Sequence, residues 1–419
     1  MVALAGVSAE PSLRETRLSR WHPYPAMVPD ELAVKLVQKY LSPGCKVLDP
    51  FCGSGRMLMA AAAIGADCVG YDVNPLALLL TEAKTASIPL SRAIELRNSA
   101  VAASQMRTGV LPIALRSPVK VPWFSEEVGI GLHEILLWIN GQDLDRSEKV
   151  ILAIALSGTT RDTAWIRKSG WKLHRESASV RALPSVSAWK KFIQRLDHYI
   201  DHADRIKLIG SVSTKFGDLR DQISGKIDNS SKYDHILTSP PYGDSKTTVQ
   251  YGAASGIFMD VVSRIIGLEY LFATGISIDR ACLGGAAQIQ AANVEIKRYW
   301  AGATESSNAG RVRKFLEDFD ESCAALAKVL KPGGVATLVV GRRTVGGFRV
   351  KLDDFVIDQL EGRGFSLLDV SKRRLRNKRL PTHINRFAGS ASHDKKVQGS
   401  TKTMGEEIVI SMRLCGKIS

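Results

Sequence analysis

Short apolar runs and segments with apolar positions at helical spacing follow one another in the N-terminal part of the chain. Residues 31–40 predict a helix, which Pro43-Gly44 ends. The following residues predict a strand at 46–49, a glycine turn at 51–55, a helix at 56–64, a second strand at 67–72 and a helix at 76–84. A strand, helix and strand within about 30 residues have the size of a nucleotide-binding half-fold. We therefore expect a parallel βαβ unit here.

This alternation stops at about residue 88 and does not return before about residue 209. Within the segment, apolar spacing predicts helices at 127–139, 149–156 and 186–209. Five of the seven tryptophans lie here, namely Trp123, Trp138, Trp165, Trp171 and Trp189. Because an uninterrupted α/β fold joins its elements by far shorter connections, residues 88–209 are predicted to form a mostly α-helical insertion.

The alternation resumes in the C-terminal half of the chain. The pattern predicts a strand within 232–242, a helix at 312–330, a turn at 331–334, a strand at 335–341, a helix at 352–361 and final strands near Leu367 and at 407–412. The predicted parts are 18–87 (first half of the main domain), 88–209 (insertion), 210–265 (second half), 266–311 (variable segment) and 312–419 (C-terminal part). We expect one main α/β domain that carries a large insertion.

Composition places the chain among ordinary globular proteins. Of its 419 residues, 45% are hydrophobic and 24% are charged, which argues against a disordered or disulfide-stapled chain. No apolar stretch approaches the ~20 residues that a membrane helix needs, and no signal peptide is evident, so we expect a cytoplasmic protein. The six cysteines include no CxxC pair, which predicts free thiols and no structural metal.

A large excess of positive charge indicates a polyanionic partner. Lysine and arginine number 57 against 42 acidic residues, a net charge of +15, and such charge favours nucleic acid by releasing counterions from phosphates. Residues 371–386 contain seven of these cations and no acidic residue. Residues 158–175 interleave basic and aromatic side chains, which suits DNA contact but equally a helical hairpin with buried tryptophans. The candidate DNA-binding residues are Arg161, Arg167, Lys168, Lys246, Arg373, Arg374, Lys378 and Arg379.

The sequence DPFCGSG, residues 49–55, follows the first predicted strand. Gly53 and Gly55 let a ligand approach the backbone at a helix N-terminus, although an ordinary tight turn has the same pattern. Asp72 stands nineteen residues after Gly53, at the end of the second strand, where a carboxylate can accept both hydroxyls of a ribose. The third glycine of a dinucleotide fingerprint is missing and Asp49 precedes the turn. These differences favour S-adenosylmethionine, whose methionine end is cationic.

The sequence TSPPY, residues 238–242, ends the strand predicted after the insertion. Its prolines lack backbone donors and fix φ, so the Ser239 hydroxyl and the Pro240 carbonyl are rigid acceptors for the two N–H bonds of an exocyclic amine. Tyr242 is then expected to stack on the ring that carries the amine. Ser-Pro-Pro-Tyr alone is more often a plain loop. Its position after a strand, downstream of Asp49 and Asp72 in a basic protein, favours an active site.

DPFCGSG and TSPPY together resemble the amino-methylating DNA methyltransferases, which modify an exocyclic amine of cytosine or adenine with S-adenosylmethionine. WHPYPAMVP (21–29) is similar to the segment that opens the methionine pocket in this family, YDVNP (71–75) to its ribose-binding segment, and GDLRD (217–221) to the turn whose acidic residue holds the adenine amine. KRLPTHINR followed by TMGEE is similar to the C-terminal segment of a bacterial subgroup. The resemblance implies a Rossmann-like methyltransferase fold with a mixed seven-stranded sheet. It covers 88–209 and 266–311 poorly, and these two segments are the candidates for DNA target recognition.

Motifs and resemblance together give the candidate site. The catalytic residues are Ser239, Pro240, Pro241 and Tyr242. The cofactor-binding residues are His22, Tyr24, Pro25, Asp49, Pro50, Phe51, Cys52, Gly53, Gly55, Asp72, Val73, Asp218 and Leu219. A packing role for His22 is an equal alternative, and Asp244 and Lys246 are candidates for ordering the loop after TSPPY.

In this family SPPY goes mainly with cytosine N4, whereas adenine N6 enzymes usually carry Asp or Asn in place of the serine. We therefore expect direct methyl transfer to N4 of a flipped cytosine in double-stranded DNA, by a bacterial, nucleoid-associated enzyme. A cognate restriction endonuclease is a further candidate partner, and the oligomeric state stays open. The alternatives are an adenine-N6 enzyme, an RNA or protein amine methyltransferase, and a non-catalytic DNA-binding protein. Covalent catalysis is disfavoured, because none of the six cysteines follows a proline.

Overall fold

The structure is a computed structural model of the chain. It describes residues 21–106, 109–113, 123–167, 174–203, 208–223, 232–244, 250–268, 277–285, 295–303, 308–374, 383–385, 391–392, 400–402 and 405–416. The chain folds as two compact units. The first unit comprises Met1–Gly44, Cys52–Phe216 and Val249–Ile278, and the second comprises Cys45–Phe51, Gly217–Thr248 and Asp279–Ser419.

Two parallel strands and the helices next to them in sequence carry the glycine turn of the first unit. β2 (Asp67–Asp72) pairs with β3 (Val212–Phe216), with Asp72 opposite Phe216. The helices α2 (Asp30–Tyr40), α3 (Arg56–Ala63) and α4 (Pro75–Thr85) agree with the predicted ranges to within one residue. Asn74 caps α4 by accepting a hydrogen bond from the Leu76 N–H, and Pro75 follows it at a position where no N–H is needed.

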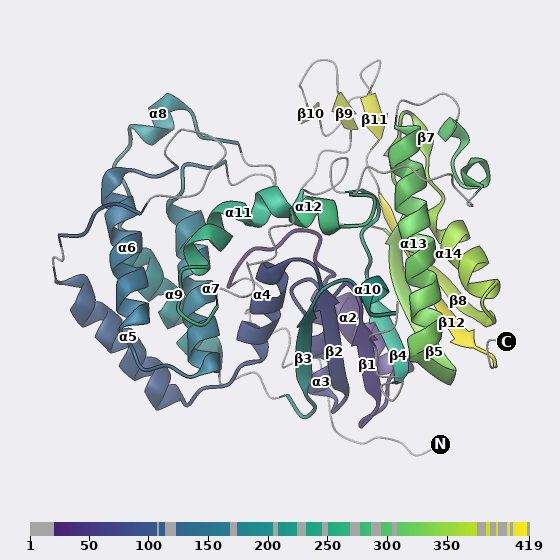
Figure 1. The fold of residues 1–419 in the computed structure, drawn as a ribbon, viewed down its shortest axis with the longest axis horizontal. Coiled ribbons are helices and arrows are strands. Elements are labelled where there is room, and N and C mark those ends of the chain that lie inside the picture. The colour runs from purple at the N-terminus through teal and green to yellow at the C-terminus, as the bar shows by residue number, and fades with distance from the viewer. Residues whose placement is uncertain are drawn as a thin grey trace. The chain divides into compact units, whose positions relative to one another are not determined.

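The described part of residues 88–209 is mostly helical. A bundle is formed by α5 (Leu90–Ser104), α6 (Glu126–Asn140), α7 (Arg146–Thr163) and α9 (Ala188–Ala203), with the short α8 (Ala178–Arg181) before α9 (Figure 1). α11 (Tyr251–Val262) packs on α7. The centre of the bundle is α7, which is buried on all sides from Val150 to Thr160.

Three predicted helix boundaries in this segment are wrong, and one of them is the end of the helix predicted at 149–156, which continues as α7 to Thr163. α7 begins before residue 149, because Asp145 and Glu148 form a capping box that starts the helix at Arg146. The helix predicted to run to residue 209 ends at Ala203. Ile209 and Gly210 instead donate their N–H groups to the carbonyl of Ala62, at the end of α3, and lead into β3. Apolar spacing did not predict α5, whose buried stripe consists only of Ala93, Leu96 and Ala100, and it did not predict α11.

The second unit contains a mixed set of strands. β1 (Lys46–Asp49), β4 (Tyr233–Thr238) and β5 (Leu330–Gly341) are parallel neighbours, and β12 (Glu406–Leu414) runs antiparallel between β5 and β8 (Phe365–Arg374). The helices α10 (Leu219–Ile223), α13 (Ala309–Val329) and α14 (Leu352–Glu361) belong to the same unit.

The predicted turn at 331–334 lies inside β5 and corrects the start of that strand. Tyr233 is opposite Leu330 and His235 is opposite Val335, so the residues between them loop out of the ladder as a bulge. Gly333 has a φ of +82° there, and Lys331 forms an ion pair of 2.6 Å with Asp234 of β4. The chain thus departs from the regular ladder at 331–334, where a turn was predicted, but β5 pairs with β4 on both sides of this bulge.

Several short elements complete the described chain. They are α12 (Ile278–Ala281), the 3-10 turns η3 (Ile296–Arg298) and η4 (Ala301–Ala303), and the strands β6 (Thr344–Val345), β7 (Phe348–Arg349), β9 (His383–Asn385), β10 (Ala391–Ser392) and β11 (Ser400–Lys402). β9 lies between β10 and β11 in a small sheet that follows the first half of the basic run.

Across the described residues, the strand order is β3-β2-β1-β4-β5-β12-β8, and β12 runs antiparallel to both of its neighbours, β5 and β8. This order confirms the predicted mixed seven-stranded sheet of a Rossmann-like α/β fold. All six cysteines are free thiols, as predicted. Within the described ranges, no helix is both long and apolar enough to cross a membrane.

Candidate active site

The turn before α3 has a backbone that only glycine adopts without strain. Gly53 and Gly55 have φ angles of +51° and +76°. Gly55 caps α3, and a Cβ atom at this position would lie 2.6 Å from the Thr81 side chain. A Cβ at Gly53 would meet only Tyr24, at 3.5 Å. The turn therefore needs glycine at 55 for packing, and at 53 the backbone can be approached closely.

Asp72, at the end of β2, holds this turn through its carboxylate. Oδ2 accepts a hydrogen bond of 2.9 Å from the Gly53 N–H, and Oδ1 accepts one of 2.8 Å from the Asn74 N–H. The carboxylate oxygens are hydrogen-bond acceptors, which is what ribose hydroxyls require. The carboxylate predicted to bind a ribose therefore lies directly beside the glycine turn.

Two side chains of α4 donate hydrogen bonds to backbone carbonyl groups of the same turn. Thr81 Oγ1 donates to the Gly53 carbonyl at 3.1 Å, and Lys84 Nζ donates to the Ser54 carbonyl at 2.8 Å. Lys84 is 1% exposed, and burial, assisted by the positive charge of Arg56, lowers its pKa to about 7. Sequence reasoning missed both residues. The available signal was that Lys84 lies four residues after Leu80 and seven after Ala77, on the apolar face of the helix.

Tyr24 is placed at the turn by a small buried network. Asn74 Nδ2 donates to Tyr24 Oη at 3.2 Å and to Ser255 Oγ of α11 at 3.0 Å. The Asn74 side chain thereby links the predicted ribose segment, the predicted methionine-pocket segment and α11 within the first unit.

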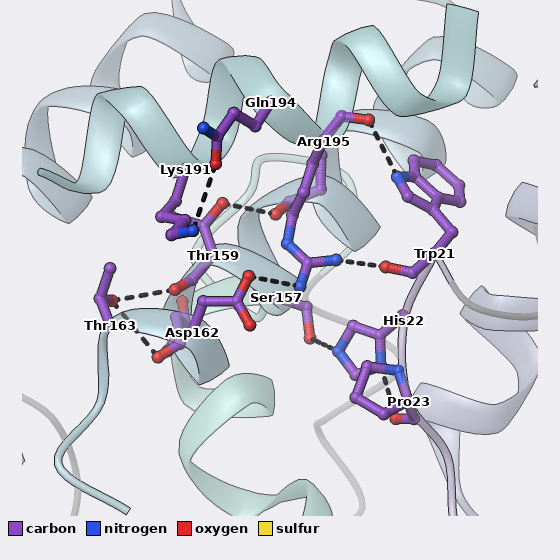
Figure 2. Close-up of polar contacts among 12 residues, drawn as sticks. Trp21, His22, Pro23, Ser157, Thr159, Asp162, Thr163, Lys191, Gln194 and Arg195 are labelled. Carbon is purple, nitrogen blue, oxygen red and sulfur yellow. Dashed lines mark hydrogen bonds and ion pairs between the residues drawn. The ribbon is translucent and has the colours of Figure 1, made fainter. Parts of the chain in front are cut away.

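His22 has a different environment from the one predicted for a cofactor ligand (Figure 2). Nδ1 lies 2.8 Å from the Pro23 carbonyl, which can only accept, so Nδ1 carries the hydrogen. Nε2 then accepts from the Ser157 hydroxyl of α7 at 2.9 Å. Burial, followed by the nearby charge of Arg195, lowers the pKa of His22 well below 6.5, so the ring is neutral. Both ring nitrogens are used within the protein, which supports the packing role.

Arg195 of α9 completes this cluster in Figure 2. It donates to the Trp21 carbonyl and to Asp162 Oδ2, the latter at 2.7 Å, while the Trp21 indole donates to the Arg195 carbonyl at 3.1 Å. The segment WHPYP is thus fixed to α7 and α9, the central helices of the insertion.

Asp49 lies in the second unit, where it joins the ends of two strands. Its Oδ1 accepts from the Thr238 hydroxyl at 2.6 Å and from the Phe51 N–H at 3.1 Å. Asp49 and Thr238 are both fully buried. Since Thr238 is the first residue of TSPPY, the aspartate that begins one motif orients the residue that begins the other.

The Ser239 and Tyr242 hydroxyl groups of TSPPY are hydrogen-bonded as well. Ser239 Oγ donates to the Val339 carbonyl of β5 at 3.3 Å and lies 3.3 Å from Tyr242 Oη. Tyr242 Oη donates to Glu407 Oε1 of β12 at 3.1 Å. Glu407 was not among the candidate residues, although it lies in the segment TMGEE.

The residues directly after TSPPY are held by a buried ion pair. Arg343 Nη2 lies 3.0 Å from Asp244 Oδ2, and both side chains are almost completely buried. The Arg343 guanidinium also lies so close to Gly243 that a Cβ at this residue would overlap it. Asp244 therefore orders the end of the predicted catalytic loop, and its partner, 99 residues away, was not identified from the sequence.

Asp218, predicted to hold the adenine amine, is paired within its own turn. It accepts from the Arg220 N–H at 2.9 Å and from the Arg220 guanidinium at 2.7 and 3.0 Å. Leu219 is buried beside it.

The other candidate residues are all at least half-buried. Cys52 is buried and donates its N–H to the Tyr71 carbonyl. The remaining ones are buried or half-buried in their segments, namely Pro25, Pro50, Phe51, Val73, Pro240 and Pro241.

Comparisons with known proteins agree with this geometry. Residues 6–82 match the N6/N4 DNA methylase family, a match that includes the glycine turn and Asp72. The chain is 27% identical to the type II methyltransferase M.MvaI of Kocuria varians, over 94% of this chain and 90% of that protein. These matches support an amino-methylating DNA methyltransferase.

Solved structures similar to this methyltransferase include TrmN from Thermus thermophilus and the rRNA methyltransferase aviRa from Streptomyces viridochromogenes. The first is 11% identical with a TM-score of 0.29, over 92% of this chain and 48% of that chain. The second is 10% identical with a TM-score of 0.32, over 94% and 89%.

S-adenosyl-L-methionine is the cofactor of this methyltransferase. The residues of the first unit fit it. The left-handed Gly53 permits close approach to the backbone, and the Asp72 carboxylate beside it is an acceptor of the kind that ribose hydroxyls need. Among the described residues, no group of three or more His, Cys, Asp or Glu side chains could hold a metal ion.

The methyltransferase's predicted DNA-binding residues have unequal environments. Arg167 and Arg374 are exposed, whereas Arg161 is half-buried and burial lowers its pKa. Arg373 forms an ion pair of 2.7 Å with Glu407. Trp165 is half-buried, with the guanidinium groups of Arg175 and Arg181 5.7 and 5.9 Å from its ring. Lys168, Lys246, Lys378 and Arg379 lie outside the described residues.

Proposed function

We propose that this enzyme transfers a methyl group from S-adenosyl-L-methionine to the N4 amine of a flipped cytosine in double-stranded DNA. The observation that carries the proposal is the environment of Ser239. Its hydroxyl hydrogen has acceptors in the Val339 carbonyl and Tyr242 Oη, so the oxygen lone pairs remain for an amine N–H. A serine at this position goes mainly with cytosine N4 in the family that the motifs resemble.

The chemical task of the catalytic motif is to make a poor nucleophile reactive. The lone pair of an exocyclic cytosine amine is delocalised into the ring. Acceptors on both N–H bonds favour the form in which positive charge develops on that nitrogen, which is the form present in the transition state. Ser239 Oγ and the Pro240 carbonyl are these acceptors, and the two prolines keep backbone donors away from them.

The first unit binds and orients the cofactor in this proposal. When bound, S-adenosyl-L-methionine supplies an electrophilic methyl group, so no protein nucleophile is required. Asp72 accepts the ribose hydroxyls, the turn at Gly53 admits the ligand to the backbone, and Thr81 and Lys84 keep the turn's carbonyls in place. Direct transfer also requires alignment of nitrogen, methyl carbon and sulfur, which supplies a proximity term.

DNA is the proposed substrate because of the family and the net charge of +15. Exposed Arg167 and Arg374 are the proposed phosphate contacts among the described candidates. M.MvaI is a type II methyltransferase, and we extend the proposal to a companion restriction endonuclease that cuts the same site.

Mass spectrometry of nucleosides tests this function directly. DNA from a host without methylases is digested with and without expression of the chain, and we expect N4-methylcytosine only with expression. N6-methyladenine instead would retain the enzyme class and overturn the base assignment. Expression of the Ser239→Ala variant is the matched control, because it leaves the cofactor residues intact. Absence of any modified base with the wild-type chain would contradict the proposal.

A further inference from the structure

A chain of polar contacts runs from the catalytic motif to the basic strand of the second unit. Tyr242 Oη donates to Glu407 Oε1 at 3.1 Å, and Arg373 Nη1 donates to Glu407 Oε2 at 2.7 Å. The Glu407 side chain is 12% exposed and that of Arg373 is 32% exposed. Arg373, which was predicted to bind DNA, therefore pairs with the Glu407 carboxylate that accepts the hydrogen bond from Tyr242.

Strand register brings these groups together. In β12, Glu407 is paired with Gly341 of β5 on one side and with Arg373 of β8 on the other. Val339, whose carbonyl accepts from Ser239, lies two residues before Gly341 in β5. The Ser239 and Tyr242 hydroxyl groups thus bond to groups on the adjacent strands β5 and β12. A shift of β12 by one residue would turn Glu407 to the opposite face of the sheet.

The chemistry of the groups fixes the direction of the hydrogen bonds. A carboxylate paired with a guanidinium has only acceptor positions, so the Tyr242 hydroxyl hydrogen points to Glu407. The phenolic oxygen can then only accept from Ser239. The Ser239 hydrogen is consequently directed either to Tyr242 Oη or to the Val339 carbonyl, and in both cases its lone pairs remain as acceptors.

We propose that Glu407, held by Arg373, is a positioning residue for methyl transfer. It fixes the Tyr242 side chain for stacking on the flipped base and keeps Ser239 as an acceptor of the base's amine hydrogen. This inference rests on the proposed function, whose catalytic motif it completes with a residue far away in sequence. Without the carboxylate, the Tyr242 hydroxyl is free to donate to Ser239, which removes a lone pair from the amine's acceptor.

A double-mutant cycle tests the proposal. We compare Glu407→Gln, Tyr242→Phe and the double variant with the wild-type chain, and measure transfer of a radiolabelled methyl group to unmethylated genomic DNA at saturating cofactor. Each single variant is expected to lower kcat about tenfold with little change in KM for DNA, the size of one charge-assisted hydrogen bond. The double variant is expected to lose no more than either single variant, because both remove the same contact.

Matched measurements separate this role from a structural one. Glu406→Gln changes the neighbouring carboxylate of the same strand and is expected to retain kcat. Cofactor affinity and the unfolding midpoint are expected to be unchanged in all variants. Tyr242→Phe keeps the ring and does not depend on how Glu407→Gln folds. The inference would be overturned if the kcat losses of the two single variants multiplied in the double variant, or if Glu407→Gln had a normal kcat. Methyl transfer by the wild-type chain would still support the proposed function in either case. A wild-type chain without methyl transfer would count against the function itself.

Discussion

The glycine turn of the first unit and the catalytic loop of the second unit are held in different ways. The turn is fixed largely by groups bonded to its backbone, with Asp72 on an N–H and Thr81 and Lys84 on carbonyls. The loop is fixed through its side chains, among them Tyr242 by Glu407 and Asp244 by Arg343. In the proposed function, the backbone of the turn binds a constant ligand, whereas the hydroxyl and phenol groups of the loop present specific acceptors to a base. The two regions should therefore respond differently to substitution.

The largest effect on turnover is expected from Ser239→Ala, which changes the loop of the second unit and leaves the glycine turn of the first unit intact. Ser239→Ala removes the hydroxyl acceptor and nothing from the first unit. We expect kcat to fall by about a hundredfold or more, as when one preorganised transition-state contact is lost. Cofactor affinity, measured by calorimetry, is expected to be unchanged.

A matched control for this variant is Ser263→Ala. The Ser263 hydroxyl also donates to a backbone carbonyl, that of Asp260 at 3.0 Å, but it lies at the end of α11. It is expected to retain turnover. Near-normal turnover in Ser239→Ala would rule out the acceptor role.

Asp72→Ala should give the opposite result. It removes the ribose acceptor and the carboxylate that holds the Gly53 and Asn74 N–H groups. We expect cofactor affinity to weaken by roughly ten- to a hundredfold, from the loss of charged hydrogen bonds, with DNA affinity retained. Asp67→Ala, at the other end of β2, is the control and should keep normal cofactor affinity. Loss of DNA binding with normal cofactor binding would contradict the assignment.

The same difference explains how much the sequence could predict. The turn's glycines and Asp72 lie within one βαβ unit, where local spacing fixes both the elements and the site. Glu407 lies 165 residues after Tyr242, and only the order β5-β12-β8 brings it to the motif. His22 likewise bonds to Ser157, 135 residues away. α5 was missed because its buried face is made mainly of alanine, which gives little periodic contrast.

Substitution of Lys84 has the smallest expected effect. It tests whether the glycine turn of the first unit is held by a neutral amine, unlike the ion-paired loop of the second unit. Its pKa is about 7 in the folded chain and near 10.5 when unfolded, because burial disfavours the charged amine. Between these values the unfolded chain carries a proton that the folded chain lacks, so Lys84 makes stability rise with pH. Lys84 adds up to about 1.4 kcal/mol per pH unit to the slope of unfolding free energy against pH. This added slope vanishes below about pH 7, where the amine is protonated in both states.

Lys84→Met removes this titration and the bond to the Ser54 carbonyl. The free energy of unfolding in urea, measured at several pH values from about 7 to 10, should therefore rise less steeply with pH than in the wild-type chain. Lys35→Met, at an exposed position of α2, should keep the wild-type slope. Parallel curves for wild type and Lys84→Met would mean that the amine stays charged when buried. The turn would then be held by a full positive charge on its carbonyl, and would resemble the ion-paired catalytic loop more than the geometry indicates.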